Sequence, residues 1–195
     1  MRNYTTEAGV AKASLLRFCK KICSGLGRVQ TKLVTAMIYG IAASESCHLT
    51  EIGRALDEGI GIKKTVDRLS RGLQSFSHRA VLWANYLKCV DKYVDETTIF
   101  PIDLSDMAKP YSRKMEAMHP VHDGSTGKNV PGYSTIEITA LAHKFKTPLP
   151  VYERVFSAAE PGFVSETEEI CNGLRFLTAR YGRDGIRVVY VGAGR

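Results

Sequence analysis

The hydrophobic pattern of this chain changes its period near residue 95, and that change limits the fold more strongly than any other feature of the sequence. Before residue 95, apolar side chains such as Leu33, Met37 and Ile41 recur at the spacing of a helix with one buried face. After residue 95, short apolar runs lie between turn residues, which is typical of strands. The sequence therefore predicts an α+β protein with a helical domain over residues 1–95 and a sheet-containing domain over residues 96–195.

Four helices are predicted in the first domain. They run from Val29 to about Ser46, from a capping Thr50 to Leu56, from about Lys63 to Leu73, and from about His78 to Val94. Gly59 and Gly61 separate the second helix from the third. Residues 1–27 are mixed and basic. Together these segments predict a basic helical bundle.

Four strands and one helix are predicted in the second domain. The strands are Thr97–Asp103, Thr135–Leu141, Leu149–Phe156 and Gly185–Val191. The helix begins after Ser165, which forms a capping box with Glu168, and its buried face carries Ile170, Leu174 and Leu177. Because this helix leads into the last strand, we expect that strand to pair in parallel within a mixed sheet.

The positive charge of the chain lies entirely in its first half. Residues 1–95 carry 15 Lys and Arg against 8 Asp and Glu, whereas residues 96–195 carry 12 of each, so the first half holds the whole excess of +7. This asymmetry predicts a polyanionic partner, and the alternative is a basic but inert surface. The sequence shows no signal peptide and no segment long enough to span a membrane, so we expect a cytoplasmic protein without a membrane partner.

The segment from Thr50 to Leu73 has the proportions of a helix-turn-helix motif. Its second helix carries four cations on the side away from its apolar residues, and these are Lys63, Lys64, Arg68 and Arg71. Cations on a helix of this size can contact phosphates and reach base edges in a DNA groove. The alternative is an ordinary solvated helix surface.

Asp103 is the candidate catalytic residue, because it ends an apolar run and is followed by the polar turn predicted for Leu104–Asp106. An enzyme that holds two metal ions needs carboxylates that converge from neighbouring strand ends. The last predicted strand is followed by Gly192–Arg195, which supplies no second carboxylate. The alternative for Asp103, and for Asp106 as well, is a structural role in capping a turn.

Other candidate sites have weaker support. The segment from Asp123 to Lys128 resembles a phosphate-binding loop but has His122 where a Gly is needed and Asn129 where a Ser or Thr is needed. We expect His119 and His122 to be surface residues, because Pro120 disfavours the helix that would align them for a metal. The five cysteines are expected to be reduced and mostly buried.

A series of motifs resembles the DDE transposases of bacterial insertion sequences. In chain order these motifs are Glu51–Leu56, Lys63–Arg71, Asp103–Asp106, Lys109–Tyr111, Lys114–Glu116, Val121–Ser125, Gly132–Tyr133, Pro148–Tyr152, Phe156–Ser157 and Ser165–Glu168. The resemblance covers nearly the whole chain from about Leu26, and it rests on the order and spacing of the motifs together.

The resemblance implies a ribonuclease H-like catalytic domain in which three acids hold two Mg²⁺ or Mn²⁺ ions for attack on a DNA phosphodiester. Asp103 matches the first acid, which ends the first strand. The second acid is expected before an Arg after the fourth strand, and if that Arg is Arg195 then Gly194 stands in the place of the acid. The third acid would lie beyond Arg195. We therefore expect an incomplete, truncated ribonuclease H-like domain that does not bind the metal ions stably and does not cleave DNA on its own.

The partners implied by the resemblance are the DNA ends of a transposon and a second transposase molecule, either as a homodimer or in association with an intact transposase. An alternative function is a non-catalytic DNA-binding protein, or an inhibitor of an intact transposase. A third class is a structural or regulatory protein without a DNA role.

Overall fold

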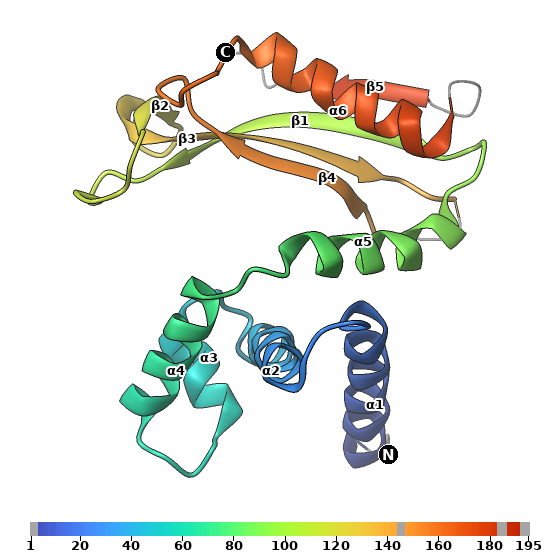
Figure 1. The fold of residues 1–195 in the computed structure, drawn as a ribbon, viewed down its shortest axis with the longest axis vertical. Coiled ribbons are helices and arrows are strands. Elements are labelled where there is room, and N and C mark those ends of the chain that lie inside the picture. The colour runs from blue at the N-terminus through green and yellow to red at the C-terminus, as the bar shows by residue number, and fades with distance from the viewer. Residues whose placement is uncertain (1–3, 144–146, 183–186, 192–195) are drawn as a thin grey trace. The chain divides into compact units, whose positions relative to one another are not determined.

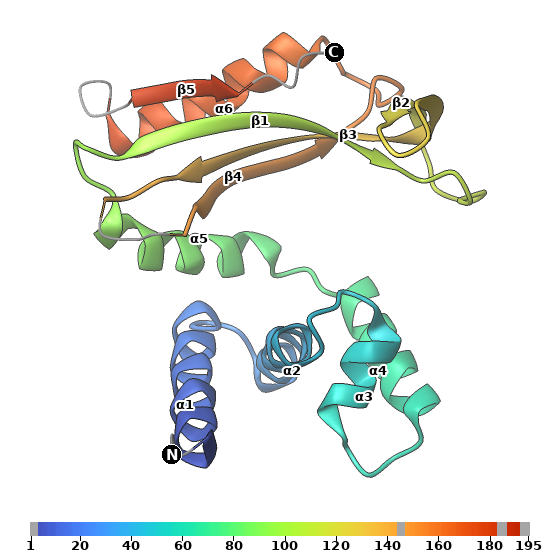
Figure 2. The ribbon, with the colours of Figure 1, turned by 180° about the vertical axis from the view of Figure 1, so that it is seen from behind.

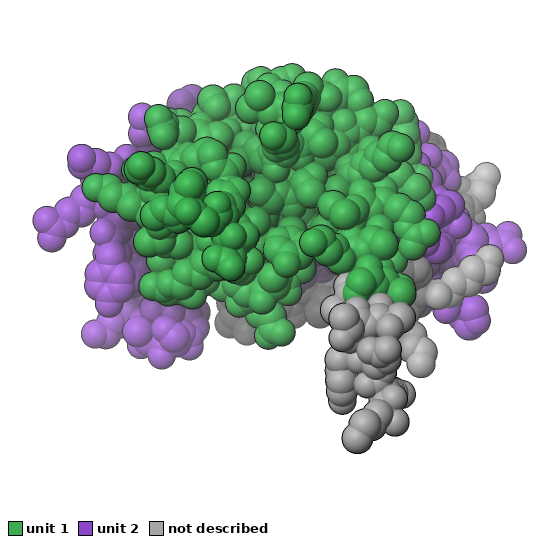
Figure 3. All heavy atoms as spheres, turned by 90° about the horizontal axis from the view of Figure 1, so that it is seen from below, with its two compact units in different colours: residues 1–89 green, residues 90–195 purple. Residues whose placement is uncertain are grey.

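The computed structural model describes residues 4–143, 147–182 and 187–191, and the fold is α+β. The chain divides into two compact units, Met1–Cys89 and Val90–Arg195, which are coloured separately in Figure 3. Helices make up the first unit, and the second consists of a sheet with a helix over it (Figures 1 and 2). The boundary predicted between residues 95 and 96 falls in the second unit, between a short 3-10 helix, η1 (Asp91–Tyr93), and the first strand.

The helices of the first unit agree closely with the predicted ones, with one addition. They are α1 (Tyr4–Ile22), α2 (Arg28–Ser44), α3 (Leu49–Leu56), α4 (Ile62–Gln74) and α5 (Arg79–Val90), the last of which reaches the first residue of the second unit. The mixed, basic N-terminal segment forms α1, which buries Cys19 and Ile22. The predicted cap at Thr50 is wrong, because α3 begins one residue earlier and its N-cap is His48, which makes no side-chain capping bond.

The core of the first unit brings α2, α3 and α4 together. It is built on Leu33 from α2, Ile52 from α3 and Leu69 from α4, and all three are buried. The helices approach closely at two glycines: a Cβ atom on Gly40 would collide with Ile52, and one on Gly72 would lie 2.9 Å from Leu33 Cδ1. These contacts hold α3 and α4 against α2, and they leave the opposite surface of α4 in contact with solvent.

The second unit contains a mixed sheet of five strands. They are β1 (Ile99–Ala108), β2 (His119–Asp123), β3 (Lys128–Ala140), β4 (Leu149–Phe156) and β5 (Arg187–Val191). Strands β1 to β4 pair in antiparallel fashion through β3, and β5 lies beside β1 in parallel, which gives the order β4–β3–β1–β5 with β2 on the N-terminal part of β3. The parallel pairing of the last strand was predicted, and the bounds of β4 match those predicted.

Three of the strand predictions differ from the structure. Strand β3 begins at Lys128 instead of Thr135. Residues Leu104–Asp106 do not form a turn, because β1 continues to Ala108 and pairs with β3 along this whole stretch. The polar side chain of Asp106 is tolerated in the strand because a cross-strand partner satisfies it: Ser134 Oγ, directly opposite on β3, donates to the Asp106 carboxylate at 3.1 Å. Strand β2 was missed because its sequence has few residues that favour strands. It forms a strand because it pairs with β3.

Pro101 lies inside β1, where a proline removes one hydrogen bond from the ladder. Continuous pairing of β1 with β3 begins at Ile102, and an isolated bridge joins Ile99 to Leu141 on the other side of the proline. The register of β3 with β4 shifts at the same level, between Ile138 and Thr139. The sheet thus accommodates Pro101 through a gap in the ladder.

Helix α6 (Glu166–Tyr181) covers one face of the sheet (Figures 1 and 2). The predicted N-cap is confirmed, because the Glu168 N–H donates to Ser165 Oγ at 3.1 Å. The side chain of Glu168 pairs with Arg175 at 2.6 Å. Gly173 allows close approach to the sheet, since a Cβ atom there would lie 2.7 Å from Ile138 Cδ1. Beneath the helix, Phe100, Ile102, Ile136, Ile138 and Leu177 form the buried core.

Charged contacts fix the two ends of α6. Near its N-terminus, Glu169 forms an ion pair with Arg154 of β4 at 2.8 Å, and its side chain is only 8% exposed. Near its C-terminus, Arg180 and Tyr181 both donate hydrogen bonds to the Asp91 carboxylate of η1. None of the described helices combines the length and the apolar character needed to cross a membrane.

Candidate functional site

Asp103 lies in the middle of β1, on the face of the sheet that points away from α6. Side chains alternate between the faces of a strand, and Ile102 belongs to the core beneath α6, so Asp103 faces the other way. The Asp103 carboxylate is exposed and accepts a hydrogen bond from Ser105 Oγ at 3.0 Å. Its neighbour on β5 is Val191, the last residue of that strand. Gly194, the position expected to carry the second acid, lies outside the described residues.

Strand pairing extends Asp103 into a row of carboxylates that the sequence analysis did not identify. Glu137 of β3 is directly opposite Asp103, and Glu153 of β4 is directly opposite Glu137. We call these three residues the acidic row. Directly opposed residues share a face of the sheet, so the three carboxylates lie on the same side, where like charges repel. Within the described part of the chain, no group of three His, Cys, Asp or Glu side chains has the geometry of a metal site.

On the other face of the sheet, Asp106 and His119 belong to one hydrogen-bonded network. Asp106 does not cap a turn, and His119 is not a free surface residue, as the sequence had suggested. Ser134 Oγ lies 3.1 Å from Asp106 Oδ1 and 3.3 Å from His119 Nε2. His119 Nδ1 in turn lies 3.0 Å from Ser157 Oγ. The network connects β1, β2, β3 and the end of β4.

The donors in this network all point in one direction. The Ala159 N–H donates to Ser157 Oγ, and Ser134 donates its proton to the Asp106 carboxylate. Ser134 Oγ must then accept from His119, which assigns the proton of a neutral imidazole to Nε2 and leaves Nδ1 to accept from Ser157. Both serines are buried, so this chain of bonds holds the start of β2 against the sheet and presents neither hydroxyl to a substrate.

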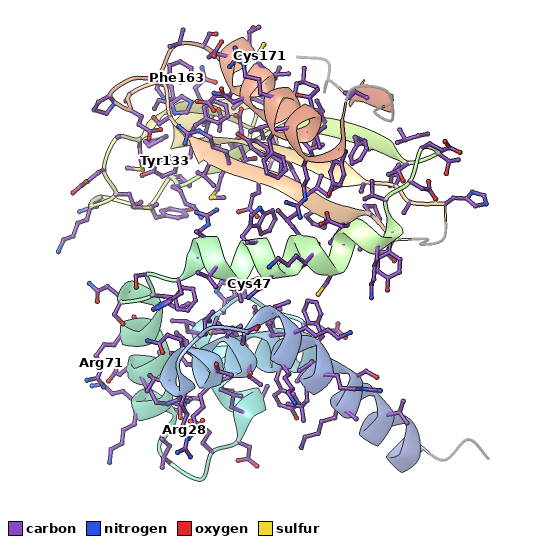
Figure 4. The ribbon with its side chains drawn as sticks, turned by 45° about the vertical axis from the view of Figure 1, so that its right-hand side comes forward. Arg28, Cys47, Arg71, Tyr133, Phe163 and Cys171 are labelled. Atoms are coloured by element: carbon purple, nitrogen blue, oxygen red, sulfur yellow. The ribbon has the colours of Figure 1, made fainter. Side chains whose placement is uncertain are left out.

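An open cavity of about 1180 Å³ lies beside this network. Its walls include Asp103, Asp106 and His119 from the sheet and Phe163 and Ser165 from the segment before α6. Phe163 stacks on Phe156 with a centroid separation of 5.9 Å, and Figure 4 labels it near the start of α6. Asp106, His119 and Phe163 therefore border one hollow at the end of the sheet, whereas the Asp103 side chain points to the other face of the sheet.

The phosphate-loop look-alike between β2 and β3 is a tight turn. The Asp123 carboxylate accepts hydrogen bonds from the Ser125 amide and hydroxyl and from Thr126 Oγ1. These bonds, led by the one from the Ser125 hydroxyl, lower the pKa of Asp123. Gly127 has a positive φ of 66°, which a glycine adopts without strain. The segment thus forms a tight turn held by its own aspartate.

The four cations predicted to bind DNA all lie on α4 and are exposed, but they differ in their contacts. Lys63, Lys64 and Arg71 lie on the side of α4 away from Thr65 and Leu69, and Figure 4 labels Arg71 at the outer surface of the helix. The Arg71 Nε atom also donates to the Asp67 carbonyl of the same helix at 3.2 Å.

Arg68 lies on the flank of α4 and contacts the turn. Its Nη2 atom is 2.6 and 2.7 Å from the two carboxylate oxygens of Glu58. Glu58 also accepts a hydrogen bond from the hydroxyl of the buried Thr65 at 3.2 Å. Arg68 therefore helps to fix the turn between α3 and α4, a role that the sequence pattern did not indicate.

The five cysteines are all free, and two of them are buried. Burial raises the pKa of the Cys19 and Cys23 thiols, which favours the unreactive protonated form. Cys47 is exposed, and Cys89 and Cys171 are half-buried, so the prediction of mostly buried thiols holds for Cys19 and Cys23 alone.

Comparison with protein-family models and with curated proteins identifies no relative of this chain. No protein-family model matches the chain, and no curated protein matches it. A functional assignment therefore depends on the residues and geometry described above, together with the motif resemblance.

Proposed function

We propose that this chain is part of a DDE-type transposase that acts in DNA transposition. In this proposal the helix-turn-helix of α3 and α4 binds duplex DNA, and the second unit is a ribonuclease H-like catalytic domain. The observation that carries the proposal is the position of Asp103 on β1, at the level where the parallel strand β5 ends. The strand order β4–β3–β1–β5, with α6 between β4 and β5, supports it as well, since the resemblance implies a first acid beside the end of the fourth core strand.

Asp103 is proposed to be one of the carboxylates that hold Mg²⁺ or Mn²⁺. It fits such a role because its oxygens are hard ligands, it is exposed, and Ser105 orients one of them. When bound, the ions supply the charge that favours attack of water or a DNA 3′-hydroxyl on a phosphodiester. A single carboxylate of the expected three does not fix two ions, so we expect this chain by itself to bind DNA without cleaving it.

The DNA-binding role is assigned to the outer surface of α4. Lys63, Lys64 and Arg71 point away from the core of α2, α3 and α4, as residues that contact a DNA groove or its phosphates must. Arg68 is proposed to act by fixing the turn through Glu58, with its remaining nitrogens available to a phosphate. This arrangement agrees with the location of the excess positive charge in the first half of the chain.

The duplex-binding part of the proposal is tested by fluorescence anisotropy of the full chain with a labelled DNA duplex between about 50 and 200 mM salt. The triple variant Lys63→Ala/Lys64→Ala/Arg71→Ala is expected to weaken binding and to reduce the slope of log K against log salt by about three. Lys88→Ala removes an exposed cation from α5 and serves as the matched control. It is expected to change the slope of log K against log salt by no more than about one. Unchanged binding by the triple variant would remove α4 as the DNA-binding helix.

The proposed catalytic role of Asp103 is tested by measuring metal binding, which does not require the chain to cleave DNA. Mn²⁺ broadens NMR signals near its binding site, so titration of the full chain is expected to broaden amides around Asp103, and Asp103→Asn is expected to abolish that effect. A plasmid-nicking assay with Mg²⁺ or Mn²⁺ is expected to give no product. Nicking that disappears in Asp103→Asn would show that the chain is an active nuclease, and broadening that persists in Asp103→Asn would remove Asp103 as a ligand.

A second candidate function is a DNA-binding protein, or an inhibitor of an intact transposase, that uses the first unit without catalysis. It is favoured by the concentration of the whole +7 charge in residues 1–95. It predicts full duplex affinity in Asp103→Asn together with no site-specific effect of Mn²⁺ in the wild-type chain. The two candidates therefore differ in the outcome of the metal titration.

A further inference from the structure

The loop between β1 and β2, residues 109–118, carries the most exposed aromatic side chain among the described residues. Tyr111 is 96% exposed. Arg113 and Lys114 follow it and are exposed, Lys109 precedes it and is half-buried, and Glu116 is the one acid of this segment. The second half of the chain is neutral as a whole, so the positive charge here is local to the loop. Figure 1 shows the loop extending beyond the end of the sheet.

The loop is held in a defined shape by backbone hydrogen bonds. The Lys109 N–H donates to the Pro131 carbonyl at 2.7 Å, and the Ser112 N–H donates to the Lys109 carbonyl at 3.0 Å, which closes a turn around Tyr111. The phenol of Tyr133 on β3 donates to the Glu116 carbonyl at 2.5 Å, and Figure 4 labels this tyrosine beside the loop. Tyr111 is therefore presented from a fixed turn, so binding through it costs little ordering of the loop.

An exposed aromatic ring between cations is the combination that proteins use for unpaired nucleic acid. The ring stacks on a base whatever its sequence, while Lys and Arg side chains contact the backbone phosphates. A duplex offers stacked bases that a tyrosine ring cannot reach, so the fully exposed ring favours an unpaired strand. We propose that the loop of residues 109–118 binds unpaired DNA, with Tyr111 stacked on a base and Arg113 and Lys114 on phosphates.

This inference rests on the proposed function, because the loop directly follows the strand that carries the proposed metal ligand Asp103. Asp103 and Ala108, the last residue of β1 before the loop, are five residues apart, which is about 17 Å along a strand. That length corresponds to about five nucleotide steps at the 3.4 Å rise of duplex DNA, and to fewer steps in an unpaired strand, which is more extended. A DNA strand with a phosphate at Asp103 would thus reach the loop with nucleotides a few steps away. Unpaired nucleotides at a cleaved or opened DNA end are the expected ligand.

The affinity test uses the full chain and a fluorescein-labelled oligothymidylate of about 20 nucleotides, measured by anisotropy at low salt. Tyr111→Ala and Tyr111→Leu are expected to weaken binding by about tenfold or more, whereas Tyr111→Phe keeps the ring and is expected to bind like the wild type. Because Tyr111 contacts little of the protein, these variants should retain the wild-type circular dichroism and thermal midpoint. Equal affinity of the wild type, Tyr111→Ala and Tyr111→Leu would overturn the proposal.

A charge-matched control and a crosslink make the test specific. Arg113→Ala/Lys114→Ala is expected to reduce the salt slope by about one to two, whereas Lys128→Ala, which removes an exposed cation from the first residue of β3, should have little effect. Photocrosslinking to an oligonucleotide that contains 5-iododeoxyuridine, followed by mass spectrometry, is expected to modify Tyr111. Crosslinks confined to residues 1–89 would overturn the proposal, and so would tighter binding of oligouridylate than of oligothymidylate, which would indicate RNA.

The outcomes separate this inference from the proposed function. The Lys63→Ala/Lys64→Ala/Arg71→Ala variant is expected to lose duplex affinity and to keep Tyr111-dependent binding of the single strand. Duplex binding without a Tyr111 effect leaves the transposase proposal in place and removes the loop from it. Tyr111-dependent binding of single strands without any effect of Asp103→Asn on Mn²⁺ binding supports the loop and removes the metal site.

Discussion

The first unit presents its candidate binding residues on one helix, whereas the second unit assembles its candidate site from strands that are distant in the sequence. In α4, the buried Thr65 and Leu69 fix which side faces the core, and the same local geometry places Lys63, Lys64 and Arg71 on the outside. In the sheet, the neighbours of Asp103 are set by the register of β1 with β3. The first arrangement depends on local spacing and the second on long-range pairing.

This difference has a consequence for stability as well as for binding. Lys63, Lys64 and Arg71 of α4 are exposed and contribute little to folding, so they are free to bind a partner, whereas Arg68 pairs with Glu58. In the second unit, several charged side chains hold elements together, as Glu169 holds α6 to β4 and Asp91 holds η1 to α6. Substitutions of charged residues should therefore affect binding in the first unit and stability in the second.

The largest effect is expected from truncating matched core residues in the two units. Ile52 and Ile138 are both 0% exposed, so Ile52→Ala and Ile138→Ala should each cost about 2–5 kcal/mol in the free energy of unfolding of their own unit. Trp83, the one tryptophan of the sequence, lies in α5 of the first unit, so its fluorescence reports on that unit. In urea, Ile52→Ala should lower the midpoint seen by Trp83 and Ile138→Ala should leave it unchanged. Equal shifts would mean that the two units unfold as one.

The next largest effect is expected at the ion pair between Arg154 and Glu169. Arg154→Met leaves the nearly buried Glu169 carboxylate without its cation, and we expect a loss of about 1–3 kcal/mol in the free energy of unfolding. The double variant Arg154→Met/Glu169→Leu removes both charges and should recover much of that loss. Thermal unfolding of the two variants measures the difference. A double variant less stable than Arg154→Met would show that Glu169 has another stabilising partner.

The same distinction between local and long-range order explains what the sequence could predict. Helices α2 to α5 and the cap of α6 at Ser165 depend on residues a few positions apart, and they were predicted within a few residues. The lateral neighbours of Asp103 required the register between strands, so Glu137 and Glu153 were missed. His119 was assigned to the surface because its partners, Ser134 and Ser157, are distant in the sequence.

Two further differences have specific physical causes. The continuation of β1 through Leu104–Asp106 was missed because polar residues resemble a turn when their cross-strand partners are unknown. The role of Arg68 was missed because helical spacing alone does not separate an arginine on the flank from one on the outer surface, and Glu58 in the turn decides it. An alternation of apolar and polar residues from Ile102 to Ser105 was a sequence signal for the longer strand.

A smaller effect is expected from the pH dependence of the contact between Tyr181 and Asp91. Burial, followed by the charge of Asp91 and the hydrogen bond to it, raises the pKa of Tyr181 to about 12. An unfolded tyrosine ionises near pH 10, so the unfolded state loses its proton first as the pH rises, and the contribution of Tyr181 is present below about pH 10 and lost towards about pH 12. Because the side chain is half-exposed, we expect a loss of about 1 kcal/mol. Urea unfolding at about pH 9 and about pH 11.5 should show a smaller pH effect in Tyr181→Phe than in the wild type. An equal effect would remove Tyr181 as its source.

The smallest effect is expected in the acidic row, where it also bears on function. Glu137 lies directly opposite Asp103, and removing one of two like charges from such a pair should stabilise the second unit by about 0.2–1 kcal/mol. Glu137→Gln should therefore raise the thermal midpoint, whereas Glu116→Gln, which removes an exposed acid from the loop of residues 109–118, should leave it nearly unchanged. If a divalent ion binds beside Asp103, it offsets the repulsion, and the gain from Glu137→Gln should shrink when Mg²⁺ is added. A gain that is independent of Mg²⁺ would indicate that the ion binds away from the row, and a loss of stability would show that Glu137 has a cationic partner that outweighs Asp103.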